Sequence, residues 1–137
     1  RIKKELIIYF FIFFISPFFA FSHADHGEMI EATPPYPTIS MDIINLYSPD
    51  YKIEFKLDNF TLIPLGRTSN PESNEGHILI LINNKKKVMI TDQTYILKRD
   101  LLRKGKNEIF IMLMDSEHSL YTKDGKIIYI SKIIYNK

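Results

Sequence analysis

The chain has 137 residues, with 18 lysines and arginines against 16 aspartates and glutamates and a formal net charge of +2. This length suits one domain with a leader segment, because a chain of this size buries one hydrophobic core but not two. The absence of cysteine excludes disulfides, thiolate metal sites and cysteine catalysis, and the small net charge argues against binding to nucleic acid.

Residues 1–24 have the three parts of a secretory signal peptide. Basic residues begin the segment, residues 6–15 form a short apolar run, and Ser22 and Ala24 offer the small side chains needed for cleavage before Asp25. The apolar run is shorter than the ~20 residues of a membrane span. We therefore expect export to the periplasm or the extracellular space, with membrane attachment only if this leader is not cleaved.

Residues 25–37 are predicted to form a flexible, proline-rich arm, since three prolines lie between residues 34 and 37. Cleavage before Asp25 would leave His26 as the second residue. Its imidazole and the free amine can then chelate Cu(II) together, because nitrogen ligands suit copper. The alternative interpretation is a polar tail whose histidine has no role.

From residue 38 onward, apolar residues alternate with polar ones, which indicates half-buried strands. The clearest case is residues 51–57, where tyrosine, isoleucine, phenylalanine and leucine alternate with lysine and glutamate. Residues 77–83 and 108–115 are apolar on both faces, and they are predicted to be neighbouring central strands.

Turn signals separate these segments about every 8 to 12 residues, with hairpin pairs at residues 83–84 and 124–125. The pattern gives seven or eight short strands and no convincing helix. It predicts an all-β fold, namely an antiparallel immunoglobulin-like β-sandwich over residues 38–137.

If the two central strands are antiparallel neighbours, the start of the first lies beside the end of the second. His77 begins the first, and Glu117 and His118 follow the second, so these side chains are predicted to reach the same end of the sandwich. Two imidazoles and a carboxylate would suit a zinc or copper ion, with Asp115 orienting a ring. The alternative is a polar loop in which His118 and Glu117 are simply solvated.

The same residues carry a resemblance to a poorly characterised family of small exported bacterial proteins. GHILILINNKKKV, at residues 76–88, resembles that family's Gly-His-x-His strand and hairpin, and DSEHS, at residues 115–119, resembles its Asn/Asp-x-His-Ser turn. The family has an immunoglobulin-like or cupredoxin-like sandwich and a suspected role with a metal, often copper. The resemblance implies that His77, Glu117 and His118 belong to a metal site.

Two histidines of the family pattern are absent from this chain. Leu79 stands where the resemblance places the second histidine of Gly-His-x-His, and residues 95–97, which read Tyr-Ile-Leu, replace an aromatic-His-Leu segment. Any metal site would therefore need the carboxylate or His26 to complete it. Without a metal, His77 and His118 would have a structural role, each holding a loop in place.

Two functions follow from these observations. One is an exported, non-enzymatic domain that binds a transition metal, copper or zinc, through His77, His118, Glu117 and His26. The other is a metal-free envelope domain that binds a protein partner. We expect no enzymatic activity, because the sequence contains no evident nucleophile–base or acid–base constellation.

Overall fold

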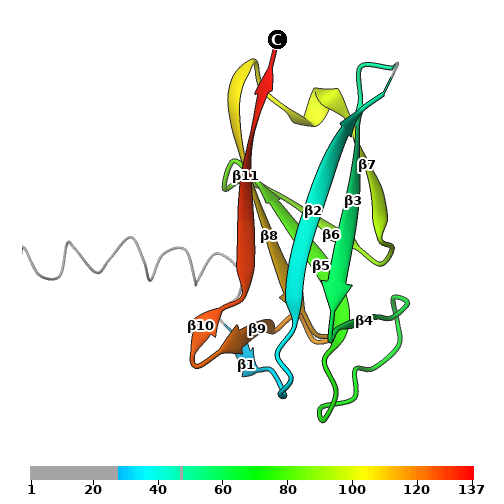
Figure 1. Cartoon of the computed structure of the whole chain (residues 1–137), viewed down its shortest axis with the longest axis vertical. Helices are drawn as coiled ribbons and strands as arrows, with labels where there is room; N and C mark the ends of the chain where they lie inside the picture. Colours follow the sequence, from blue (N-terminus) through cyan, green and yellow to red (C-terminus); the bar gives the residue numbers. More distant parts are fainter. Residues whose placement is uncertain (1–27, 47) are drawn as a thin grey trace, which may run out of the picture.

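A computed structural model describes residues 28–46 and 48–137 and shows a sandwich of two β-sheets (Figure 1). The predicted signal peptide and His26 lie outside these residues. The larger sheet has eight strands and the smaller has three, so the described residues form more strands than the seven or eight predicted. In chain order the elements are β1 (Met29–Glu31), β2 (Thr38–Asn45), β3 (Tyr51–Asp58), β4 (Thr61–Leu62), β5 (Glu75–Ile82), β6 (Lys86–Ile90), β7 (Thr94–Leu97), a 3-10 turn η1 (Arg99–Leu101), β8 (Gly105–Met114), β9 (Leu120–Lys123), β10 (Lys126–Ile127) and β11 (Tyr129–Asn136).

The smaller sheet consists of β2, β3 and β7, paired antiparallel in that order. In β3, Tyr51, Ile53 and Phe55 are buried, whereas between them Lys52 is half-buried and Glu54 is exposed. The alternation predicted for this segment is therefore confirmed. It arises because one face of the sheet packs on the core while the other meets solvent.

The order β6-β5-β8-β11 forms the main part of the larger sheet, and all three of these pairings are antiparallel. The register places His77 opposite Met114, so the start of β5 lies beside the end of β8, as expected from the sequence. Asn83 and Asn84, between β5 and β6, have positive φ angles of 52° and 60°. Asparagine tolerates this conformation, which the predicted hairpin requires.

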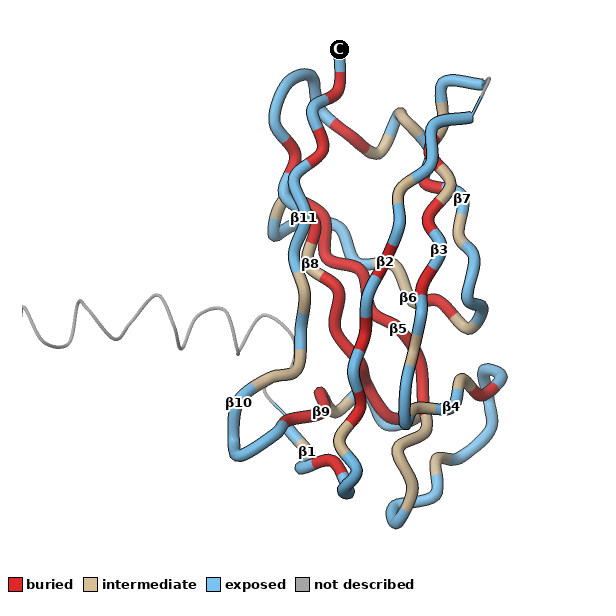
Figure 2. Tube along the Cα trace, in the orientation of Figure 1, coloured by how far each residue is buried: buried red, intermediate tan, exposed pale blue. Residues whose placement is uncertain are grey.

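Two apolar clusters lie on the two faces of the larger sheet. The first fills the space between the sheets and includes Ile80 of β5 and Ile111 of β8, neither of which has exposed surface. The second lies on the outer face and includes Leu79 and Met112, because side chains alternate along each strand. β5 and the second half of β8 are therefore buried on both faces, as Figure 2 shows.

Residues 28–37 are tied to the sandwich, which corrects the prediction of a flexible arm. β1 pairs in parallel with β9, and Ala32, which follows β1, is buried and donates its N–H to the carbonyl of Thr122. The Asn74 side chain bonds both backbone groups of Thr33, at 2.8 and 2.7 Å. The prolines come after this paired segment and do not prevent its pairing.

The larger sheet is mixed, not purely antiparallel, because β1–β9 and β4–β5 are parallel pairs. The residues after the turn at 124–125 form two strands, β10 and β11, which are separated at Ile128, whose N–H donates to the carbonyl of Tyr121. Within residues 28–46 and 48–137 there is no helix with the length and apolar character needed to cross a membrane.

The Glu31 carboxylate joins β1 to the turn between β9 and β10. It accepts hydrogen bonds from the Thr122 hydroxyl at 2.7 Å and from the N–H groups of Asp124 and Gly125 at 2.6 and 3.1 Å. All three bonds favour the ionised carboxylate, so they lower the pKa of Glu31 below its ordinary value of 4.5. The bond from Thr122 makes the largest contribution.

The pKa of Glu31 is lower in the folded than in the unfolded chain, so its contribution to stability is present above pH 4.5 and is lost as the pH falls through the folded-state pKa. Glu31→Gln is expected to remove this part of the acid dependence. Denaturant unfolding between about pH 5 and about pH 3 measures the effect. Glu117→Gln, at an exposed carboxylate, is the control, and an unchanged acid dependence in Glu31→Gln contradicts this role.

Candidate functional site

His77 lies near the start of β5, on the outer face of the larger sheet. Alternation along β5 puts it on the same face as Leu79 and Leu81, away from the smaller sheet. The residue is 2% exposed, and neither Nδ1 nor Nε2 has a hydrogen-bond partner within the described part of the chain. Buried polar atoms are almost always paired, so two unpaired nitrogens on one ring need an explanation.

Three methionines are neighbours of His77 in the strand register on this face. Met114 of β8 lies directly opposite His77, and Met112 is a diagonal neighbour because it pairs with Leu79. On the other side, Met89 of β6 also pairs with Leu79 and is the second diagonal neighbour. Directly opposite residues have Cβ atoms about 5 Å apart, and diagonal neighbours lie about 7–8 Å apart. Flexible methionine side chains can bridge such distances.

The turn after β8 contains the acidic residues and the second histidine of the predicted site. Asp115 is buried, and its Oδ1 accepts the N–H groups of Glu117 at 3.0 Å and Ser119 at 2.8 Å. This carboxylate therefore shapes the turn, and it does not bond to the ring of His77, whose two nitrogens have no partner among the described residues. His118 has a positive φ of 70° within the turn, and the side chains of His118 and Glu117 are exposed.

The described residues do not bring the predicted ligands into one metal site. In residues 28–46 and 48–137, no group of three or more histidine, aspartate or glutamate side chains could hold a metal ion. His77 is buried on an apolar face, whereas His118 and Glu117 meet solvent. His26 lies outside the described residues. The potential ligands that the strand register places opposite or diagonal to His77 on β6 and β8 are thioethers instead.

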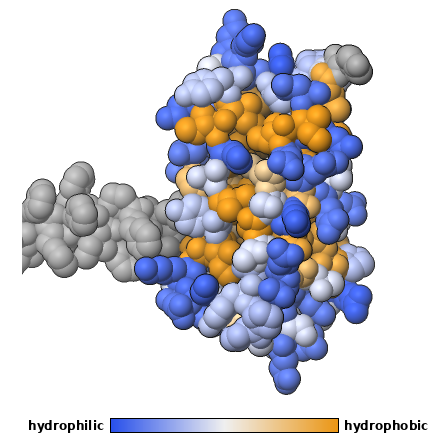
Figure 3. Space-filling model, viewed as in Figure 1, coloured by the Kyte–Doolittle hydropathy of each residue, from blue (hydrophilic) through white to orange (hydrophobic). Residues whose placement is uncertain are grey.

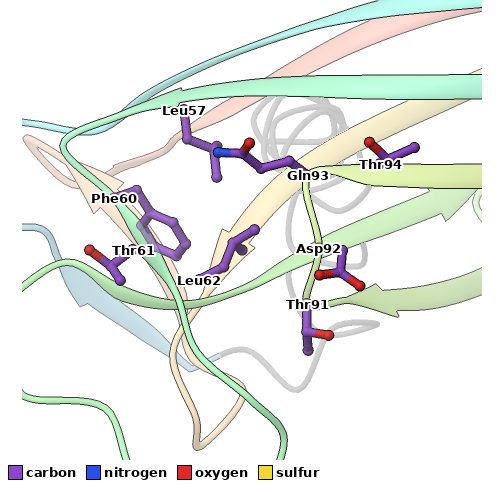
Figure 4. Close-up of a pocket in the computed structure, with 8 residues that line it drawn as sticks. All are labelled: Leu57, Phe60, Thr61, Leu62, Thr91, Asp92, Gln93 and Thr94. Atoms are coloured by element: carbon purple, nitrogen blue, oxygen red, sulfur yellow. The ribbon is translucent and has the colours of Figure 1, made fainter.

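A separate hollow of about 670 Å³ opens at the edge of the sandwich, between β4 and the connection from β6 to β7 (Figure 4). Leu57, Phe60 and Leu62 form its apolar side, and residues 91–94 form much of its polar side. Asp92 is the one ionisable residue in this lining. General acid–base or nucleophilic catalysis needs at least two converging groups, so this hollow lacks the elements of a catalytic site.

The methionines are the part of the site that the sequence analysis does not identify. A methionine in an apolar strand indicates a core residue, so Met112 and Met114 do not stand out. The available signal is that Met112 and Met114 are two residues apart, so their side chains lie on the same face of a strand. If residues 77–83 and 108–115 are antiparallel neighbours, this face can be the one that carries His77.

Comparison with known proteins identifies no relative. No family model, curated protein or solved structure matches the chain. The resemblance of residues 76–88 and 115–119 to a family of exported sandwich proteins therefore depends on those motifs alone. A function has to be argued from the geometry around His77.

Proposed function

We propose that this protein is an exported, non-enzymatic domain that binds copper in its reduced state, Cu(I), on the outer face of the larger sheet. The observation that carries the proposal is the buried ring of His77, whose two nitrogens have no partner and which lies opposite Met114. Imidazole suits copper, and thioether ligands select Cu(I). Met112 and Met89 offer further thioethers on the same face.

The apolar surroundings of His77 favour a monovalent ion. Leucines of β5 and β9 belong to the same outer cluster as Met112 and Met114. A divalent ion placed there would lose much of its hydration energy without an anionic ligand to offset the loss. One neutral imidazole and neutral thioethers form a soft ligand set of low charge, which matches Cu(I) better than Zn(II).

Metal binding also gives a reason for a histidine at this position. A buried polar atom without a partner costs about 1–3 kcal/mol, and an apolar side chain of similar volume would avoid that cost. Coordination of an ion by His77 would supply the missing partner for one ring nitrogen.

His118, Glu117 and His26 are candidates for a second ligand set, suited to Cu(II) or zinc. His118 and Glu117 are exposed, so this set would bind an ion at the surface. The two sets depend on different residues, and variants can therefore separate them. Export is proposed from the signal-like residues 1–24, and the non-enzymatic role is proposed from the sequence, which has no evident nucleophile–base or acid–base constellation.

Anaerobic titration with Cu(I), in competition with a chromogenic chelator, tests the proposal. His77→Leu is expected to weaken Cu(I) binding by about 100-fold and Met114→Leu by about tenfold, which correspond to losses of about 2.7 and 1.4 kcal/mol. Both substitutions nearly conserve volume. His77→Leu also removes two unpaired nitrogens. Without metal, the free energy of unfolding of this variant is therefore expected to be about 1–2 kcal/mol higher than that of the wild-type protein.

Met41→Leu is the matched control, because Met41 is buried between the sheets and not on the outer face. It should leave the Cu(I) affinity unchanged. His118→Ala separates the two ligand sets, and an affinity loss as large as that of His77→Leu would move the site to the turn. The proposal is overturned if the wild-type protein competes for Cu(I) no better than His77→Leu does.

A further inference from the structure

β2 and β11 are edge strands of the two sheets and lie side by side along one side of the sandwich, and we call the line between them the seam. In the described part of the chain, β2 pairs only with β3 and β11 pairs only with β8. Each strand therefore has one edge whose backbone N–H and C=O groups are outside any strand ladder. Figure 1 shows both strands on the near side of the molecule, running along its length.

A hollow opens at each end of this seam, and each is lined by residues of both strands. The hollow near the end of β2, of about 500 Å³, includes Ile43 of β2 and Ile134 of β11. The hollow near the start of β2, of about 510 Å³, includes Ile39 of β2 and Ile130 of β11. Figure 3 shows hydrophobic residues exposed over this side of the molecule.

Lys132 occupies the middle of the seam. It pairs with Ile109, which is fully buried between the sheets, so Lys132 lies on the core-facing side of β11 between Ile130 and Ile134. Lys132 is nevertheless exposed, and no ion pair is found for it within the described residues. A core-facing lysine keeps its hydration only where no strand of the other sheet covers it, so the sandwich is open at this point.

Positive charge predominates around the seam. The residues that line the two hollows include the cations Lys123, Lys126, Lys137 and Arg99, in addition to Lys132 between them, and the anions Asp50 and Asp124. Asp50 already accepts a hydrogen bond from the Arg99 backbone, at 2.9 Å. An occupant of the seam is therefore expected to be apolar where it meets the hollows and acidic where it meets Lys132.

We infer that the seam binds an extended segment of a protein partner as an added β-strand along β11. In this mode, backbone ladder bonds give affinity and alternate side chains give specificity. Successive side chains on one face of a strand are two residues apart. The partner segment therefore carries an acidic residue facing Lys132 and apolar residues two positions before and two positions after it, facing Ile130 and Ile134.

The segment belongs to a different protein. No aspartate or glutamate in this sequence has apolar residues at both second-neighbour positions. Pairing of two β11 strands is disfavoured as well. The antiparallel register that sets Tyr129 opposite Tyr135 of a second copy also sets Lys132 opposite Lys132, and like charges directly opposite are destabilising.

A capped peptide in which isoleucine, glutamate and isoleucine alternate with threonine tests the inference by calorimetry and amide chemical-shift mapping. We expect binding with a Kd below about 100 µM and shifts concentrated on β11. Lys132→Glu is expected to weaken binding of this peptide at least tenfold. The same variant is expected to bind a second peptide, which has lysine in place of glutamate, more tightly than the wild-type protein does. The same binding is expected in His77→Leu, so this result does not depend on the metal site.

Lys56→Glu, on the exposed face of the smaller sheet, is the matched control and should leave both peptide affinities unchanged. A peptide with the same side chains but N-methylated backbone should not bind, because it cannot donate ladder bonds. The inference is overturned if no peptide binds, if the shifts map away from β11, or if Lys132→Glu fails to reverse the preference between the two peptides.

Discussion

Gly76→Ala is expected to lower the free energy of unfolding by about 4 kcal/mol or more, a large part of the roughly 5–15 kcal/mol that stabilise a single domain. A Cβ at this position would overlap the carbonyl oxygen of Met114 and lie 2.8 Å from its carbonyl carbon and 2.9 Å from the Cα of Asp115. All three are backbone atoms, so no side-chain rotation relieves the overlap and β5 must move away from β8.

Gly105→Ala is the control for this substitution. Gly105 also has positive φ, of 86°, but no atom lies within 4 Å of the position that a Cβ would take. The expected cost is about 1–2 kcal/mol, from backbone strain alone. Denaturant unfolding of both variants measures the difference, and a Gly76→Ala loss no larger than that of Gly105→Ala would contradict the steric explanation.

The close approach at Gly76 also bears on the proposed copper site. The next residue, His77, is paired with Met114, whose carbonyl is the group that excludes a side chain at Gly76. The Gly-His sequence therefore has a physical basis in this chain. The glycine lets the start of β5 approach the end of β8, and the histidine that follows is placed directly opposite a methionine.

Strands with many residues could be predicted from the sequence because their signal is local. In residues 51–57 the alternation of apolar and charged side chains is itself the cause of burial on one face. β1 could not be predicted in this way. It has three residues, and its pairing with β9 depends on residues 120–122, far away in the chain. Its neighbouring prolines gave a stronger local signal for an unpaired arm.

The candidate site was predictable in its position but not in its ligands. The neighbouring apolar strands placed His77 beside the end of β8, and the register confirms this. Whether a side chain on such a strand is buried depends on what packs over the outer face, which periodicity does not encode. The same limit applies to Asp115, because its bonds to Glu117 and Ser119 follow from the turn conformation and not from residue spacing.

Asn107 joins three segments of the chain through one buried side chain. Its Nδ2 donates to the carbonyls of Arg103 at 2.9 Å, Gly105 at 3.1 Å and Ile134 at 3.4 Å. Its Oδ1 accepts from the Arg103 N–H and from the Asn83 amide, both at 2.9 Å. The residue has no exposed surface. It therefore holds the β5–β6 turn, the segment before β8 and β11 together.

Asn107→Asp is expected to lower the free energy of unfolding by about 4 kcal/mol at neutral pH. An ionised carboxylate of the same shape cannot donate hydrogen bonds and would face three carbonyl oxygens. Burial and these carbonyls would raise the pKa of the introduced carboxyl in the folded state above its ordinary value of about 3.9. The deficit should therefore be small below about pH 3.9, where the carboxyl is protonated in both states, and should grow as the pH rises through the folded-state pKa.

Denaturant unfolding of wild type and Asn107→Asp from about pH 3.5 to about pH 8 measures this deficit. Asn45→Asp, at an exposed position of β2, controls for the added charge and should show little deficit at any pH. A deficit in Asn107→Asp that does not change with pH would contradict the argument, since it would place the loss in packing. Growth of the deficit with pH, absent from the control, would show that the donor bonds of this amide hold the three segments together.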